Sequence, residues 1–151
     1  MQHCHILLSC FQNAFPLKKK ALTQNSDHSR IEANDWHYYC RALAHLGLSQ
    51  RENFKSDLRR AVQIAQEDYK KDSDNYRNTA NLALYCIVAR SYDKAKQLYQ
   101  EIVSKEAPLL YIREAIRDLQ NLLTIFPNYP HAQEIEGFLQ SVLSQRRYPV
   151  A

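Results

Sequence analysis

Apolar residues recur every three or four positions along most of this chain, and that spacing is typical of amphipathic helices. One clear stripe is formed by Leu82, Ala83, Cys86 and Ile87. No segment alternates apolar and polar residues with the period of two that a β-strand shows. The stripes predict helices at about residues 4–15, 34–47, 51–70, 75–89, 92–103, 109–126 and 130–143. We therefore expect an all-α fold.

Residues able to begin or end a helix lie between the stripes. Short polar side chains at a helix start accept hydrogen bonds from backbone N–H groups, and proline fits the first turn. The candidates are Asn34 or Asp35, Asp74 or Asn75, and Pro130. At the other ends, Gly47 can close a helix in the left-handed conformation, and Pro108 and Pro127 interrupt the pattern.

The first third of the sequence divides from the rest. Residues 4–15 carry an amphipathic stripe that Pro16 ends, and residues 16–33 are polar and without a clear period. We expect three parts: an N-terminal helix with a polar linker (1–33), a helical-repeat domain (34–147) and a tail (148–151). An exposed apolar stripe favours burial against something, so the first helix is expected to cap the array, dock on a partner or form a homodimer.

The stripes after residue 34 form pairs of related pattern. The motifs are Trp36-x2-Tyr39-Cys40-x2-Leu43 followed by Phe54-x3-Leu58-x2-Ala61, and Thr79-x2-Leu82-Ala83-x2-Cys86 followed by Ala95-x3-Tyr99-x2-Ile102. In these motifs, residues 34–127 resemble the tetratricopeptide repeat (TPR) family. The resemblance implies helical hairpins stacked as a short right-handed superhelix, whose concave face binds a peptide or helical segment of another protein.

The repeat is uneven. The family repeats about every 34 residues, whereas Trp36 and Thr79 are 43 residues apart and Phe54 and Ala95 are 41 apart. The segment Ala115-x3-Leu119-x2-Leu122, closed by Pro127, is interpreted as only the second half of a third unit.

The resemblance also implies which residues face a partner. The first helix of each pair lines the concave face, and Arg41, His45 and Arg77 there favour an acidic or polar peptide. An ordinary solvated surface is the competing interpretation. The implied partner-binding residues are His37, Tyr38, Arg41, His45, Arg77, Asn81, Leu84 and Val88.

Composition excludes several classes of protein. The chain has two glycines among 151 residues, Gly47 and Gly137, whereas a phosphate-binding loop needs two or three within about eight residues. Gly137 lies inside a predicted helix, where glycine costs about 1 kcal/mol relative to alanine unless close packing requires it. The net charge of +4 is spread along the chain, which argues against nucleic-acid binding.

Candidate chemistry is sparse. The four cysteines lie far apart at apolar positions, which suggests free thiols in the cytoplasm. No apolar run reaches the roughly 20 residues of a membrane span. The spacing of His3, Cys4 and His5 fits no common zinc site, and Glu114 and Asp118 are assigned to a solvated helix face. We predict no catalytic residue, metal or cofactor.

The leading hypothesis is therefore a cytoplasmic protein-interaction module of TPR-like helical hairpins. Two alternatives stay open at this point. The chain could be a regulatory or sensor domain of a larger signalling or nucleotide-binding system, or a weakly basic module associated with nucleic acid.

Overall fold

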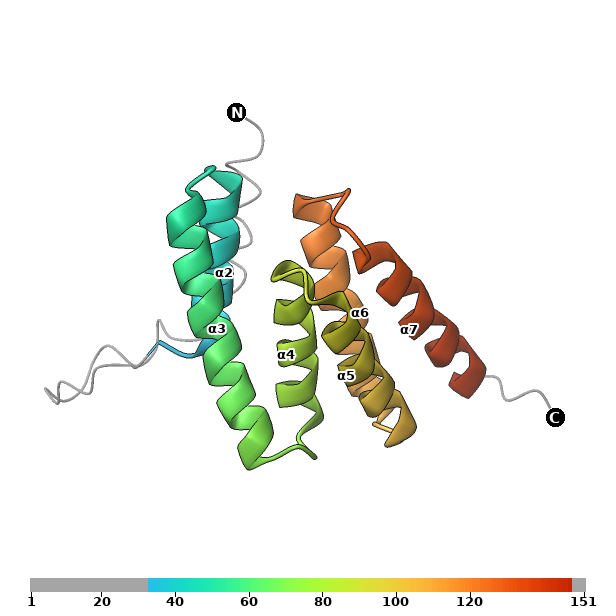
Figure 1. Ribbon diagram of the computed structural model, residues 1–151. Helices are drawn as coiled ribbons and strands as arrows, with labels where there is room; N and C mark the ends of the chain where they lie inside the picture. Colours follow the sequence, from blue (N-terminus) through green and yellow to red (C-terminus); the bar gives the residue numbers. More distant parts are fainter. Residues whose placement is uncertain (1–32, 148–151) are drawn as a thin grey trace, which may run out of the picture.

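The computed structural model describes residues 33–147, and these form an all-α stack of six helices without strands (Figure 1). The predicted helix at 4–15, the linker up to residue 32 and the tail at 148–151 lie outside the described residues. Helix bounds agree with the prediction to within a few residues. The helices are α2 (Asp35–Gly47), α3 (Arg51–Lys71), α4 (Tyr76–Val88), α5 (Tyr92–Ser104), α6 (Leu109–Ile125) and α7 (Ala132–Arg147).

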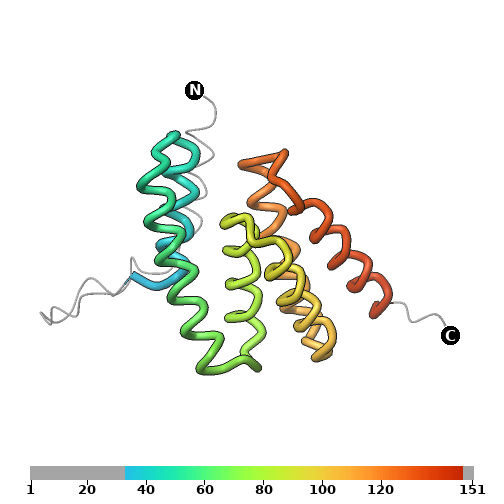
Figure 2. The backbone as a smooth tube through the Cα atoms, in the orientation of Figure 1, coloured from blue at the N-terminus to red at the C-terminus, as the bar shows by residue number. Residues whose placement is uncertain are grey.

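The helices pack as three consecutive hairpins, α2–α3, α4–α5 and α6–α7 (Figure 2). Helix α4 lies at the centre, because it contacts α3 and α6 as well as its own partner α5. Every residue from position 82 to 88 is buried, so α4 has apolar neighbours on all sides along that stretch. The predicted stacking of hairpins is confirmed.

The third hairpin corrects one interpretation of the repeat. Helix α6 packs against α4 and then pairs with α7, so it is the first helix of its own hairpin. Its buried residues include Ile112, Ala115, Ile116 and Leu119, a stripe wide enough to meet both neighbours. The prediction that this segment repeats only the second half of a unit is wrong.

The predicted N-caps of α2 and α4 are confirmed as asparagines. The Asn34 side chain accepts from the backbone N–H of His37 (3.1 Å), and the His37 ring accepts from the N–H of Asn34 (3.3 Å). The Asn75 side chain accepts from the backbone N–H groups of Arg77 (3.1 Å) and Asn78 (3.3 Å). Each cap satisfies N–H groups that have no partner inside the helix.

Turns of the stack use left-handed residues other than glycine. Gly47 does not adopt that conformation; Ser49 does instead (φ 59°), because the chain turns only after α2 has continued through Gly47. Arg90 (φ 61°), Glu106 (φ 54°) and His131 (φ 61°) occupy the other turns. A side chain in this region costs roughly 1–2 kcal/mol relative to the right-handed conformation. The prediction for Gly47 is therefore wrong in position by two residues.

The start of α7 also differs from the prediction. Pro130 precedes the helix by two residues, because the left-handed His131 separates it from Ala132, the first helical residue. The helix itself carries Gly137, and a Cβ atom placed there meets no atom within 4 Å. Close packing does not require this glycine.

Replacing Gly137 with alanine is expected to raise the free energy of unfolding by about 1 kcal/mol. The gain comes from the backbone entropy that glycine loses in a helix, and no neighbour opposes the added methyl group. Urea unfolding followed by circular dichroism measures it. Equal or lower stability of the variant would contradict the prediction.

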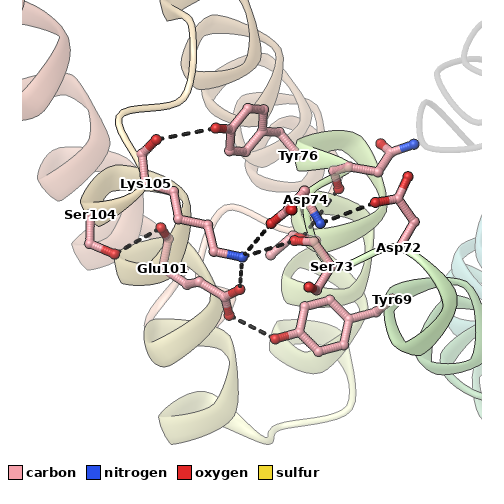
Figure 3. A network of polar contacts seen from close by, with 10 residues as sticks. Tyr69, Asp72, Ser73, Asp74, Tyr76, Glu101, Ser104 and Lys105 are labelled. Carbon is pink, nitrogen blue, oxygen red and sulfur yellow. Dashed lines mark hydrogen bonds and ion pairs between the residues drawn. The ribbon is translucent and has the colours of Figure 1, made fainter.

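A network of polar contacts holds one end of the stack together (Figure 3). The Lys105 ammonium lies 3.1 Å from the Ser73 carbonyl, 3.1 Å from an Asp74 carboxylate oxygen and 2.8 Å from Glu101. The Tyr69 hydroxyl donates to the other Glu101 oxygen (2.8 Å). Burial alone would raise the pKa of Glu101, but the bonds from Lys105 and Tyr69 outweigh it and lower that pKa.

Two further contacts lie at the same end. The Tyr76 hydroxyl donates to the backbone carbonyl of Lys105 (3.1 Å). The Arg146 guanidinium donates to the carbonyls of Ala107 (2.8 Å) and Val103 (2.6 Å), which ties the end of α7 to the α5–α6 turn. We call these contacts and the Lys105 network the polar clasp. It joins all three hairpins at one end.

Candidate functional site

The two predicted cationic residues of α2 contact the next helix in the same hairpin. The Arg41 guanidinium donates to both carboxylate oxygens of Asp57, at 2.6 and 2.7 Å, and His45 lies 3.4 Å from the same group. Asp57 is only 6% exposed. The bond from Arg41 holds the pKa of Asp57 below its ordinary value. Arg41 therefore joins α2 to α3, and its charge is already paired.

The other predicted residues of α2 also have contacts within the first hairpin. The guanidinium of Arg41 lies 5.2 Å from the centre of the Tyr38 ring, a cation–π arrangement. His37 is part of the cap of its own helix. The four residues of α2 thus lie around an internal ion pair.

The predicted residues of α4 fall into two groups. Arg77 lies 3.3 Å from Glu114 of α6, and the Asn81 amide donates to Asp35 of α2 (3.3 Å). Leu84 and Val88 are 1% and 2% exposed, so they belong to the core. Their assignment to an outward face is wrong, because α4 is the central helix and its neighbours cover both sides. The face formed by α2, α4 and α6 is thus cross-linked by its own polar pairs.

A cleft lies at the end of the stack opposite the polar clasp (Figure 1). Its origin is a difference in helix length: α3 has 21 residues and α4 only 13. Eight residues of helix correspond to about 12 Å, so the first half of α3 extends beyond the α4–α5 turn. The α6–α7 turn forms the facing wall.

The cleft consists of two adjoining hollows of about 600 and 620 Å³. They share Leu46, Arg90 and Tyr129. We call the joined hollows the end cleft. It is lined by Leu46, Gly47, Phe54, Lys55, Leu58, Arg59, Val62, Gln63, Gln66, 88–90 and 124–130.

The lining of the end cleft is apolar with basic residues. Half-buried apolar side chains such as Phe54, Val62 and Phe126 form its walls. The charged lining residues are Lys55, Arg59 and Arg90. No aspartate or glutamate is among the described residues that line it, so the local charge is positive.

The floor of the end cleft is fixed by one hydrogen bond. The Tyr129 hydroxyl donates to the backbone carbonyl of Val88 (2.7 Å), which holds the α6–α7 turn against the end of α4. Burial raises the pKa of this hydroxyl. Beside it, the left-handed Arg90 lines both hollows and a third of about 550 Å³ between the starts of α5 and α7.

Comparison with known proteins adds no relative. No family model, curated protein or solved structure matches the chain. No helix in the described part is both long and apolar enough to cross a lipid bilayer. Within residues 33–147, no three His, Cys, Asp or Glu side chains cluster as a metal site would require.

A carboxylate outside the cleft was also assigned wrongly from the sequence. Asp118 of α6 is largely buried, and burial is the main reason that its pKa rises to about 6; Glu114 adds to the rise. Arg117 and Arg77 act in the opposite direction without cancelling it. The hydroxyl of Tyr99, which Asp118 influences electrostatically, is buried and has no hydrogen-bond partner within the described chain. The face at this position is not solvated.

Sequence reasoning missed the end cleft, although signals for it were present. The predicted lengths of the second and fourth helices already differed, and the two-residue connection Arg90-Ser91 marked where the middle hairpin stops. Those lengths become a cleft only when the helices are aligned at one end. That alignment is a property of packing.

Proposed function

We propose that this protein is a protein-interaction module, a TPR-like stack of helical hairpins that binds a segment of a partner protein without catalysing a reaction. The observation that carries the proposal is the end cleft, where all three hairpins meet around an apolar lining. The proposal includes a cytoplasmic location, in keeping with Cys86, whose thiol is buried and has its pKa raised to about 11 by that burial.

The end cleft is the better binding surface for physical reasons. Residues on the face of α2, α4 and α6 are paired to one another, so a ligand there would have to replace existing ion pairs. In the end cleft, aromatic, arginine and aliphatic side chains are half-buried around open space. Aromatic residues and arginine are the groups that most often dominate binding energy at interfaces.

The proposal is tested by selecting random peptides of about 16 residues, displayed on phage, against the full chain. We expect enriched peptides to bind in the end cleft, since their side chains gain apolar burial there. Ala89 is exposed in the cleft lining, and replacing it with tryptophan fills the floor. Fluorescence anisotropy should show about a tenfold loss of affinity for the Ala89→Trp variant.

The matched control is Gln145→Trp, an equally exposed position of α7 outside the cleft lining. We expect it to change affinity by less than about twofold, as surface substitutions remote from a site usually do. Circular dichroism confirms that both variants fold. Failure to enrich any peptide would overturn the proposed function, and equal binding by both variants would move the site elsewhere.

A further inference from the structure

The charges that line the end cleft are open to a ligand. Arg59 and Arg90 have no carboxylate within ion-pair distance among residues 33–147. Lys55 has one, Glu52 at 3.2 Å, but both side chains are well exposed. Exposed pairs of this kind contribute little and exchange easily. Three cations around an apolar floor therefore present unpaired positive charge to whatever enters.

Arg90 holds the most informative position of the three. It ends the α4–α5 turn in the left-handed conformation, where glycine would be less costly. Its side chain lines both halves of the end cleft. A guanidinium at this point meets a carboxylate in either half and can bind it through two parallel hydrogen bonds.

The walls of the end cleft indicate the shape of the occupant. One wall is the first half of α3, and the other is the end of α6 with the turn that follows it. Two helical walls and an apolar floor form a groove that accepts one face of a third helix, with anchors spaced three or four residues apart. The overhang of α3, about 12 Å, matches about two turns of such a helix.

We propose that the end cleft binds an acidic amphipathic helix of a partner protein, apolar face inward, with Arg90 as the central anchor for its carboxylates. This inference rests on the proposed function and adds the chemistry of the partner segment. Arg59 and Lys55, which lie along the α3 wall, pair with further carboxylates on the same helix.

The probes are three synthetic peptides of about 16 residues that share one apolar face of leucine and phenylalanine. Their flanking positions carry glutamate, glutamine or lysine. Labelled peptides are titrated with the full chain and followed by fluorescence anisotropy. We expect the acidic peptide to bind about tenfold more tightly than the neutral one, and the basic peptide to bind most weakly, because the cations are otherwise unpaired.

The decisive variant is Arg90→Gly, which removes the guanidinium and at the same time suits the left-handed backbone. Its matched control is Glu106→Gly, which relieves the same conformation at the α5–α6 turn, outside the cleft lining. Urea unfolding should show that neither variant is less stable than wild type. We expect Arg90→Gly to weaken the acidic peptide about tenfold and Glu106→Gly to change it by less than about twofold.

The outcomes separate the inference from the proposed function. If the neutral peptide binds as well as the acidic one and Ala89→Trp abolishes both, the cleft is a binding site but the acidic chemistry is wrong. Equal binding by Arg90→Gly and Glu106→Gly, or no binding by any of the three peptides, overturns the inference. Displacement of the acidic peptide by single-stranded DNA of equal length and concentration would also overturn it, in favour of a nucleic-acid ligand.

Discussion

Replacing Arg41 with methionine is expected to lower the free energy of unfolding by about 2 kcal/mol at pH 7. Arg41 is half exposed, but its partner Asp57 is buried, so the variant leaves a carboxylate in the hairpin interface with only His45 nearby. An unpaired buried charge costs more than the pair contributed. Chemical denaturation at several pH values measures the loss.

The reverse substitution is expected to cost less. Asp57→Asn leaves Arg41 free to turn toward solvent, so we expect a loss of about 1 kcal/mol, the value of ordinary hydrogen bonds. The pKa of Asp57 is lowered by Arg41, so the stabilisation by the pair is complete above the ordinary pKa near 3.8 and disappears as the pH falls through the lower folded value. The difference between wild type and Arg41→Met should therefore shrink in strong acid.

Arg113→Met is the control for these measurements. Arg113 is exposed on α6, and the substitution makes the same change of side chain within a helix. We expect an effect below about 0.5 kcal/mol, as for most surface substitutions. A loss as large for Asp57→Asn as for Arg41→Met would contradict the explanation from burial.

Replacing Asp118 with asparagine is expected to raise the free energy of unfolding by about 2 kcal/mol at pH 7.5. The folded pKa of about 6 exceeds the ordinary value of 3.8, so folded Asp118 binds a proton more tightly than unfolded Asp118 does. Stability from this group is therefore complete below about pH 4 and is lost as the pH rises through 6. Asparagine has no charge to bury, so the variant keeps that stability.

The pH dependence tests this interpretation directly. The two proteins should have nearly equal stability at pH 3.5 and diverge between pH 4 and 7. Glu67→Gln, at an exposed position of α3, is the matched control and should show no such divergence. A constant difference between wild type and Asp118→Asn at all pH values would show that a packing change, and not the charge, is responsible.

The helices could be predicted because each depends on a local pattern. An apolar stripe with a period near 3.6 needs no knowledge of the partner helix, and asparagine caps act on backbone groups two or three residues away. The left-handed turns were harder to predict. Glycine scarcity pointed to Gly47, but the chain placed Ser49 in that conformation, where two backbone bonds to α2 close the turn.

The predicted site failed for a different reason. The bond between Arg41 and Asp57 joins residues 16 positions apart and depends on how α2 and α3 align. In the same way, Leu84 is outward on an isolated helix but inward once α4 lies at the centre of the stack. The end cleft arises from an overhang between hairpins. None of these properties belongs to a single segment, so no local pattern contains them.

The polar clasp makes α3 a lever. At the clasped end, Tyr69 and the α3–α4 turn are bound to α5. At the other end, within residues 33–147, no hydrogen bond or ion pair connects residues 46–58 to another hairpin. A helix of 21 residues is about 31 Å long, so a pivot of about 5° moves its free tip by about 3 Å. The width of the end cleft is thus the dimension that changes most for a given rotation.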